Sequence, residues 1–111
     1  MSGICIYAEQ YENRIEESAF ELITAARALS AQSGEHIMAL VLGQDPDALS
    51  RQLSFQDVQV AAVKTEISAL QDDALSICVA EALRQLAPSS VLIPANRTCR
   101  ALFSRVAARI D

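Results

Sequence analysis

The chain has 111 residues, of which 51% are hydrophobic, and a formal net charge of −5. This length is that of one domain, which can bury about two-thirds of its unfolded surface without metals or disulfides. The acidic charge argues against a general nucleic-acid binder, and no apolar run reaches the roughly 18 residues needed to insert across a membrane. The N-terminus shows no signal-peptide pattern, so a cytoplasmic location is expected.

Four short apolar runs alternate with four segments of helical periodicity. The runs show almost no polar alternation, which is typical of strands covered on both faces of a sheet. In chain order, the predicted elements are strand Gly3–Ala8, helix 14–33, strand His36–Leu42, helix 46–53, strand Val58–Val63, helix 68–87, strand Val91–Ala95 and helix 97–110.

Several residues fit the ends of these helices. Gly34 fits the left-handed residue that ends the first helix. Asp45 with Pro46 fits the N-cap and first position of the second helix, and Ser68 with Gln71 fits a capping box for the third.

The first and last helices each show one apolar stripe that is expected to face the sheet. In the first helix the stripe comprises Ile15, Ala19, Leu22, Ile23, Ala26 and Leu29. In the last helix it comprises Cys99, Leu102, Phe103, Val106, Ala107 and Ile110.

This alternation predicts an α/β fold with three layers, in which helices cover both faces of a mainly parallel sheet. The expected strand order is 3-2-1-4, as in Rossmann-like folds of the nucleotide-binding type. Residues 1–111 are expected to form a single domain. A further strand would normally follow the last helix, so we expect this domain to be the N-terminal part of a longer subunit.

A candidate binding crevice lies where the strand order reverses, between the first and fourth strands, beyond their carboxyl ends. Its expected lining is Glu9–Asn13 on one side and Asn96–Arg100 on the other. Asn96 is a good N-cap, and the backbone N–H groups behind it, together with Arg97 and Arg100, would attract a phosphate or carboxylate. Alternatively, Asn96 is only a cap and the arginines face solvent or another subunit, because this junction lacks the glycines of phosphate-binding turns.

Basic residues are concentrated at the same end of the chain. Residues 97–111 contain four arginines against one acid, whereas the rest of the chain is strongly acidic. One end of the molecule is therefore expected to be locally basic. The four residues are Arg97, Arg100, Arg105 and Arg109.

The other titratable candidates favour structural roles. His36 is the only histidine, and no acid, serine or cysteine partner for it is evident in the sequence. Asp72 and Asp73 lie near a helix start, where carboxylates usually complement the helix dipole. We therefore expect no catalytic residue and no metal site in this chain.

The three cysteines are an odd number, and none lies in a CxxC pair. Neither a disulfide framework nor a zinc site is predicted. Cys5 and Cys78 are expected in the core, where a free cysteine behaves as a small hydrophobic residue. Cys99 is expected to be buried and slow to react with thiol reagents.

Three stretches resemble the N-terminal domain of the electron transfer flavoprotein alpha subunit: ICIYAEQ, ELITAARALSAQSGEHIMALVLGQD and SSVLIPANRTCRALFSRVAARID. The family has a strand ending in Ala-Glu, a helix with Leu-x-x-Ala-Arg-x-Leu, a strand ending in Val-Leu-Gly and a last helix ending in Ala-Ala-Arg-Leu. The resemblance covers nearly the whole chain. It departs at Pro94, Asn96 and Cys99, where the family has glycine, threonine and glycine, and the Cys99 side chain fills space that the family leaves open.

The resemblance implies an electron carrier rather than an enzyme. In this family the alpha subunit pairs with a beta subunit, and the heterodimer passes electrons from flavin dehydrogenases to an acceptor. The FAD is held mainly by the C-terminal domain of the alpha subunit, beyond Asp111, so this segment alone is expected to bind no cofactor. The alternative is a stand-alone nucleotide- or anion-binding module that uses the crevice near Asn96–Arg100.

Overall fold

A computed structural model describes residues 3–55, 57–66 and 72–110 of the protein. Four parallel strands form the main sheet: β1 (Ile4–Tyr7), β4 (Ile37–Gly43), β5 (Val58–Lys64) and β6 (Ser90–Leu92). Their spatial order is β5-β4-β1-β6. Numbered along the chain, this is the predicted order 3-2-1-4, which is therefore confirmed.

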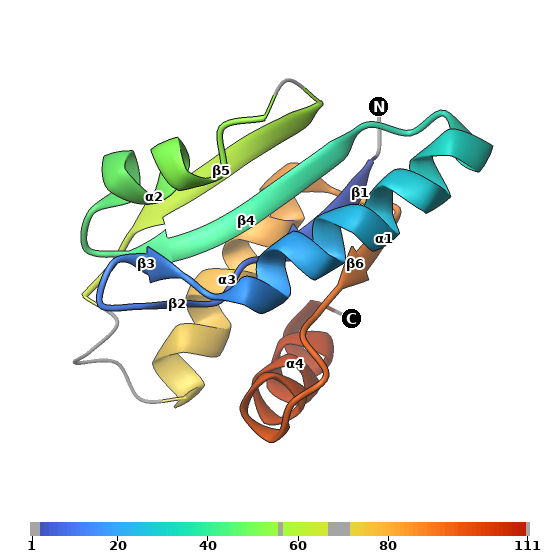
Figure 1. Ribbon diagram of the computed structural model, residues 1–111. Helices are drawn as coiled ribbons and strands as arrows, with labels where there is room; N and C mark the ends of the chain where they lie inside the picture. The colour runs from blue at the N-terminus through green and yellow to red at the C-terminus, as the bar shows by residue number, and fades with distance from the viewer. Residues whose placement is uncertain (1–2, 56, 67–71, 111) are drawn as a thin grey trace.

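Two helices cover each face of the sheet (Figure 1). The helices α1 (Glu17–Ser33) and α2 (Pro46–Gln52) pack on one face. The helices α3 (Asp72–Leu86) and α4 (Arg97–Ile110) pack on the other. The predicted three-layer α/β fold is confirmed, and none of the described helices is long and apolar enough to cross a membrane.

The inner strands β1 and β4 are buried along their whole length, which explains their continuously apolar sequences. Successive side chains point to opposite faces, so Ile4 and Ile6 face α1 and α2, while Cys5 and Tyr7 face α3 and α4. Each fully buried aliphatic side chain of this kind contributes about 1.5–3 kcal/mol. The sheet therefore divides the interior into two separate cores.

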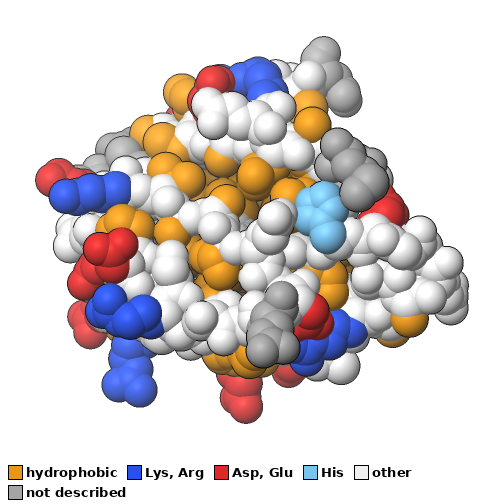
Figure 2. Space-filling view, turned by 90° about the horizontal axis from the view of Figure 1, so that it is seen from above, with side chains coloured by type: hydrophobic (Ala, Val, Ile, Leu, Met, Phe, Trp, Pro, Cys, Tyr) orange, Lys and Arg blue, Asp and Glu red, His pale blue; other side chains and the backbone are white. Residues whose placement is uncertain are grey.

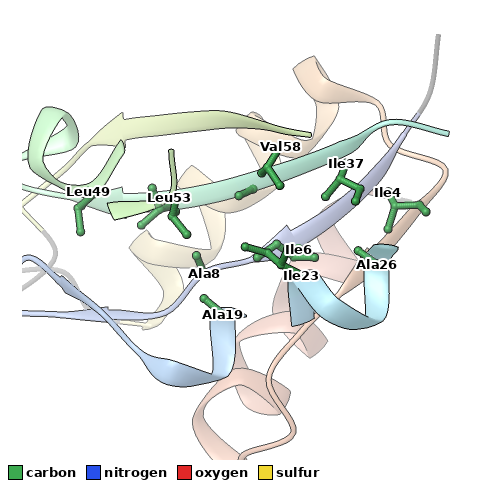
Figure 3. Packing of buried hydrophobic residues seen from close by; sticks show 12 residues of the cluster. Ile4, Ile6, Ala8, Ala19, Ile23, Ala26, Ile37, Leu49, Leu53 and Val58 are labelled. Carbon is green, nitrogen blue, oxygen red and sulfur yellow. The ribbon is translucent and has the colours of Figure 1, made fainter. Parts of the chain in front are cut away.

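The core beneath α1 and α2 is aliphatic (Figure 3). Small residues on α1, Ala19 and Ala26, are fully buried and let the helix approach β1 closely. Further side chains come from the sheet, from α1 and from the region of α2: Ile4, Ile6, Ala8, Ile23, Ile37, Ala39, Val41, Leu49, Leu53 and Val58.

The core beneath α3 and α4 contains two of the cysteines. Cys5 and Cys99 are buried, as predicted, and the half-buried Cys78 packs against the same cluster. The remaining buried members are Tyr7, Met38, Leu40, Leu42, Val79, Ala80, Leu83, Leu102 and Val106.

The segment between β1 and α1 differs from the prediction of a polar connector followed by a helix from Arg14. It forms a small antiparallel hairpin of β2 (Gln10–Tyr11) and β3 (Arg14–Ile15). At its turn, Glu12 and Asn13 have φ angles of 50° and 63°, the left-handed conformation of two-residue hairpin turns. Helical spacing alone did not predict this local turn.

The helix α1 therefore begins at Glu17, after an N-cap at Glu16. Arg14 and Ile15 are paired with Tyr11 and Gln10 in the hairpin, so their backbone is extended and not helical, and the N–H of Ile15 donates to Oε1 of Gln52 at 2.8 Å. The N–H of Glu16 likewise donates to the carbonyl oxygen of Glu9 at 2.8 Å. The hairpin therefore occupies the residues that were predicted to begin the helix.

Three other predicted helix ends can be compared with the structure. Gly34 has φ of 75° and donates to the carbonyl of Ser30, which confirms the left-handed end of α1. The Asp45 side chain accepts from the N–H of Ala48 at 3.1 Å, which confirms the cap of α2. The predicted capping box of Ser68 and Gln71 lies outside the described residues.

Some predicted core positions on α1 and α4 are instead exposed. Leu29 and Ile110 are 44% and 43% exposed, and Ala107 also faces solvent, so these expectations were wrong. The helix α4 packs mainly against α3, and only Cys99, Leu102 and Val106 of its apolar stripe are buried. The last part of the stripe lies beyond these buried positions.

The strand β6 ends at Leu92, three residues before the predicted end at Ala95. Pro94 has no N–H to donate to a strand ladder, and its carbonyl accepts from the N–H of Asn96 at 2.9 Å. This tight turn ends the strand and directs the chain into α4.

Candidate functional site

The crevice at the N-terminus of α4 begins with a well-formed helix cap. The side-chain Oδ1 of Asn96 accepts from the N–H of Cys99 at 2.8 Å. The carbonyl of Asn96 accepts the first helical bond, from the N–H of Arg100 at 3.0 Å. The prediction that Asn96 caps the last helix is confirmed.

The opposite side of the crevice is formed by Glu9, just after β1. Its Oε1 accepts from Nδ2 of Asn96 at 2.8 Å. A negative charge beside the first turn of a helix is stabilised by the helix dipole. The position that the sequence predicted for a bound phosphate or carboxylate is therefore next to the chain's own carboxylate.

The cysteine and tyrosine in this crevice are held in their neutral forms. Burial, and then the charge and hydrogen bond of Glu9, raise the pKa of Cys99 to about 12, although a bond from Asn96 opposes this. Burial, followed by the charges of Cys99 and Glu9, also raises the pKa of Tyr7. The Tyr7 ring packs edge-on against Phe103, with centroids 5.1 Å apart. A neutral, buried thiol is a hydrogen-bond donor and not a nucleophile.

The arginines of α4 divide into two groups. Arg97 and Arg100, in the first turn, are exposed, and their guanidinium groups make no hydrogen bond or ion pair within the described part of the chain. Arg105 instead pairs with Asp73 at 3.2 Å, and Arg109 also binds α3. Only the first two arginines are thus available to an external partner at the crevice.

Of the residues expected to line the crevice from the β1 side, Glu9 is the one that hydrogen-bonds Asn96. Gln10 and Asn13 instead bond the end of β4 and the loop that follows it. Nε2 of Gln10 donates to the carbonyl of Leu42 at 3.0 Å, and Oδ1 of Asn13 accepts from the N–H of Asp45 at 3.3 Å. The sequence predicted the helix cap at Asn96 but did not indicate which acid would contact it.

The other polar candidates are distant from this crevice or serve packing. The carbonyl of His36 accepts from the N–H of Ile4 at 2.9 Å, at the opposite end of β1. Its ring lies against Gly3, where an added Cβ would be 2.8 Å from ring atoms. Asp73 is paired with Arg105. Within residues 3–55, 57–66 and 72–110, no three His, Cys, Asp or Glu residues are placed to hold a metal ion.

Comparison with known protein families gives a match over nearly the whole chain. The electron transfer flavoprotein domain family matches residues 4–111. The match includes both sides of the crevice, from β1 to α4.

Individual relatives carry the names of electron-transfer subunits. The chain is 31% identical over 109 residues to lactate dehydrogenase (NAD(+),ferredoxin) subunit LctC of Acetobacterium woodii, covering 96% of this chain and 26% of that protein. It is 26% identical over 109 residues to the acryloyl-CoA reductase electron transfer subunit beta of Anaerotignum propionicum, covering 96% and 30%. Over 51 residues it is 35% identical to the electron transfer flavoprotein subunit alpha of Megasphaera elsdenii, covering 46% and 15%. The chain thus spans less than a third of the length of these relatives.

Proposed function

The chain belongs to the electron transfer flavoprotein domain family, and from this premise we propose that it is the N-terminal scaffold domain of an alpha-type subunit. The complete protein would be a cytoplasmic heterodimer with a beta subunit. It would carry FAD and pass electrons between flavin dehydrogenases and an acceptor. Support comes from the relatives, two of which are named as subunits of a dehydrogenase and of a reductase system.

The observation that carries the scaffold role is the contact between Glu9 and Asn96. A dinucleotide bound in this crevice would place its phosphates near the N-terminus of α4. That position adjoins the Glu9 carboxylate, which would repel them. The residues of this crevice do not fit FAD, so we place the flavin in a part of the complete protein outside this chain.

The surface beside the crevice suits a protein partner better than a cofactor. Arg97 and Arg100 project from the first turn of a helix whose cap is already complete. Arginine is enriched in protein interfaces because its planar guanidinium group forms several directed hydrogen bonds. We propose that the two arginines contact a subunit partner, with the beta subunit as the candidate.

The alternative function is a stand-alone nucleotide- or anion-binding module that uses Asn96, Arg97 and Arg100. The two free guanidinium groups favour it. The Glu9 carboxylate at the same helix terminus opposes it, because it would have to move or be protonated before an anion could take its place.

Two measurements test the proposal. Calorimetry of the 111-residue chain with FAD, AMP and ATP should give no binding heat. The native gene product, purified from its host with associated subunits, should show flavin absorbance. A colourless, monomeric native product would refute the electron-carrier proposal. A micromolar nucleotide signal that is lost in Arg100→Ala would instead support the stand-alone module.

A further inference from the structure

The strand β5 lies at one edge of the sheet and pairs with β4 over its whole length of seven residues. Its sequence VQVAAVK contains no proline or glycine, and its only charge is at its last residue, Lys64. Soluble proteins usually protect such edges with charges, prolines or bulges. This edge has none of these devices along its central residues.

One hydrogen bond identifies which residues of β5 direct their backbone groups away from the sheet. The N–H of Thr65 donates to the carbonyl of Gly43 at 2.8 Å, and Gly43 is paired with Lys64 in the register of the two strands. In a parallel pair, alternate residues direct both backbone groups to the same side. The odd-numbered residues of β5 therefore face β4. The even-numbered residues Val60, Ala62 and Lys64 direct their N–H and C=O groups away from the sheet.

The middle of this edge is apolar and partly exposed, from Val60 to Val63, and the exposed Gln59 and Lys64 lie toward its two ends. Figure 2 views the molecule from the side on which β5 lies uppermost in Figure 1, and shows hydrophobic side chains gathered in the middle of the face with charged groups around them. A hollow of about 370 Å³ adjoins the strand on its α3 side, lined by Met38, Gln59, Val60, Ala61 and Leu86.

We propose that the β5 edge pairs in antiparallel fashion with the β5 edge of a second copy of this chain, forming a continuous eight-stranded sheet. The register that uses the whole strand places Val60 of one copy opposite Ala62 of the other. The outward-facing backbone groups all belong to even-numbered residues. In this register every even-numbered residue of one copy lies opposite an even-numbered residue of the other, so the N–H and C=O groups of the two strands meet. The edge is therefore complementary to itself.

Side chains and charges support the same register. It places Val63 of each copy beside Gln59 of the other, next to the hollow, where a branched apolar side chain can be buried. It also places Lys64 of each copy opposite Val58 and close to Asp57 of the other. Asp57 bonds Arg27 of α1, and Lys64 points to the same face of the sheet, so the opposite charges at the two ends of β5 come together twice in the dimer.

Sedimentation equilibrium of the 111-residue chain should show a monomer–dimer equilibrium. Amide hydrogen exchange gives the residue-level readout: the N–H groups of Val60 and Ala62 should become protected as the concentration rises. Those of Ala61 and Val63, which face β4, should be protected at every concentration. A chain that stays monomeric at all concentrations overturns the proposal. So does a dimer in which Val60 and Ala62 exchange rapidly.

Two variants test the edge without disturbing the fold. Ala62→Pro removes an N–H that faces away from β4, so the chain should fold with an unchanged circular dichroism spectrum. Its dimer association should weaken at least about tenfold. Ala62→Ser keeps the N–H and should retain the dimer. An unchanged association constant in folded Ala62→Pro overturns the proposal.

The charge reversal Lys64→Glu keeps the proposal testable if the proline variant fails to fold. It should weaken association about three- to tenfold, because it sets two acids side by side at each end of the paired strands. Arg97→Glu makes the same change in net charge at the start of α4, just after the strand at the other edge of the sheet, and should alter association less than about twofold. Equal effects of the two reversals would overturn the proposed register. Protection of Val60 and Ala62 only when another subunit is added to a monomeric chain would assign the edge to that subunit and not to a second copy.

Discussion

A 2.8 Å hydrogen bond joins the side-chain amide of Asn96 to the carboxylate of Glu9, although 87 positions separate them in the sequence. Asn96 uses both ends of its amide: Nδ2 binds Glu9, and Oδ1 caps α4 through the N–H of Cys99. One side chain therefore fixes the start of the last helix against the end of the central strand β1. The chemistry of the crevice depends on this connection.

Replacing Asn96 by alanine should lower the free energy of unfolding by about 1–2 kcal/mol, because it removes the helix cap and the partner of Glu9 together. Urea denaturation monitored by circular dichroism measures this change. Asn96→Asp is the informative control, since it keeps the cap acceptor but sets a second carboxylate against Glu9. Relative to the parent protein, Asn96→Asp should lose more unfolding free energy at neutral pH than at about pH 4, where carboxylates begin to protonate. A deficit in Asn96→Ala below about 0.3 kcal/mol would contradict the role assigned to this bond.

Glu9→Gln should make Cys99 easier to ionise. The charge and hydrogen bond of Glu9 contribute to raising the pKa of Cys99 to about 12, so removing the charge should lower this pKa, although burial will keep it above that of a free thiol. The measurement is the rate of alkylation by iodoacetamide against pH, in a background where Cys5 and Cys78 are replaced by alanine. Cys99 should react slowly in the parent protein and faster at alkaline pH in the variant.

The control for this experiment is Glu12→Gln in the same background, since Glu12 is exposed at the turn of the hairpin. It removes an equal charge far from the thiol and should leave the rate unchanged. Rapid alkylation in the parent protein would contradict the burial of Cys99, and identical rates in both variants would contradict its coupling to Glu9.

Stability should fall as the pH rises above about 9, with Cys5 as one cause. Burial raises the pKa of Cys5 to about 12, against a weaker lowering effect from a backbone bond at Leu40, whereas an unfolded cysteine ionises near 8.5. Between these values the unfolded chain releases a proton that the folded chain retains. The contribution of Cys5 to the free energy of unfolding is therefore complete below about pH 8.5. It declines as the pH rises toward 12, by at most about 1.4 kcal/mol per pH unit.

Urea denaturation at a series of alkaline pH values tests this. Cys5→Ala should lower stability at neutral pH but reduce the slope of the unfolding free energy against pH. Ile6→Val, which also leaves a small core cavity but removes no thiol, should lower the whole curve and keep the slope. If both variants keep the parent slope, Cys5 does not contribute to it.

Two arginines of the same helix should differ in their effect on stability. Nε of Arg109 donates to Oγ of the fully buried Ser76 at 2.9 Å, and its carbonyl accepts from Arg84 of α3. Arg109→Ala should therefore lower the free energy of unfolding by about 0.5–1.5 kcal/mol. Arg97→Ala, at an exposed position, should change it by less than about 0.5 kcal/mol. Thermal and urea unfolding of the two variants side by side provide the comparison, and a reversed order would contradict the assignment of Arg109 to packing.

The sequence alone determined the layered fold and the strand order. Continuous apolar runs such as Ile37–Leu42 occur where a strand is covered on both faces, and this requires helices on both sides of a parallel sheet. The ends marked by Gly34, Asp45 and Asn96 were also predictable, because a cap acts within a few residues along the chain. Each of these features depends on local backbone geometry or on a periodic pattern.

Only the tertiary structure decided where α1 begins, which ends of the apolar stripes are exposed, and what lies at the N-terminus of α4. Ile15 lies in the hairpin, paired with Gln10, and its N–H bonds the side chain of Gln52, 37 positions away. Ile110 is exposed at the end of α4, a helix that packs mainly against α3. Glu9 meets Asn96 because β1 lies beside β6 in the sheet. Such contacts depend on which strands are neighbours and on how far each extends, and no spacing along the chain encodes them.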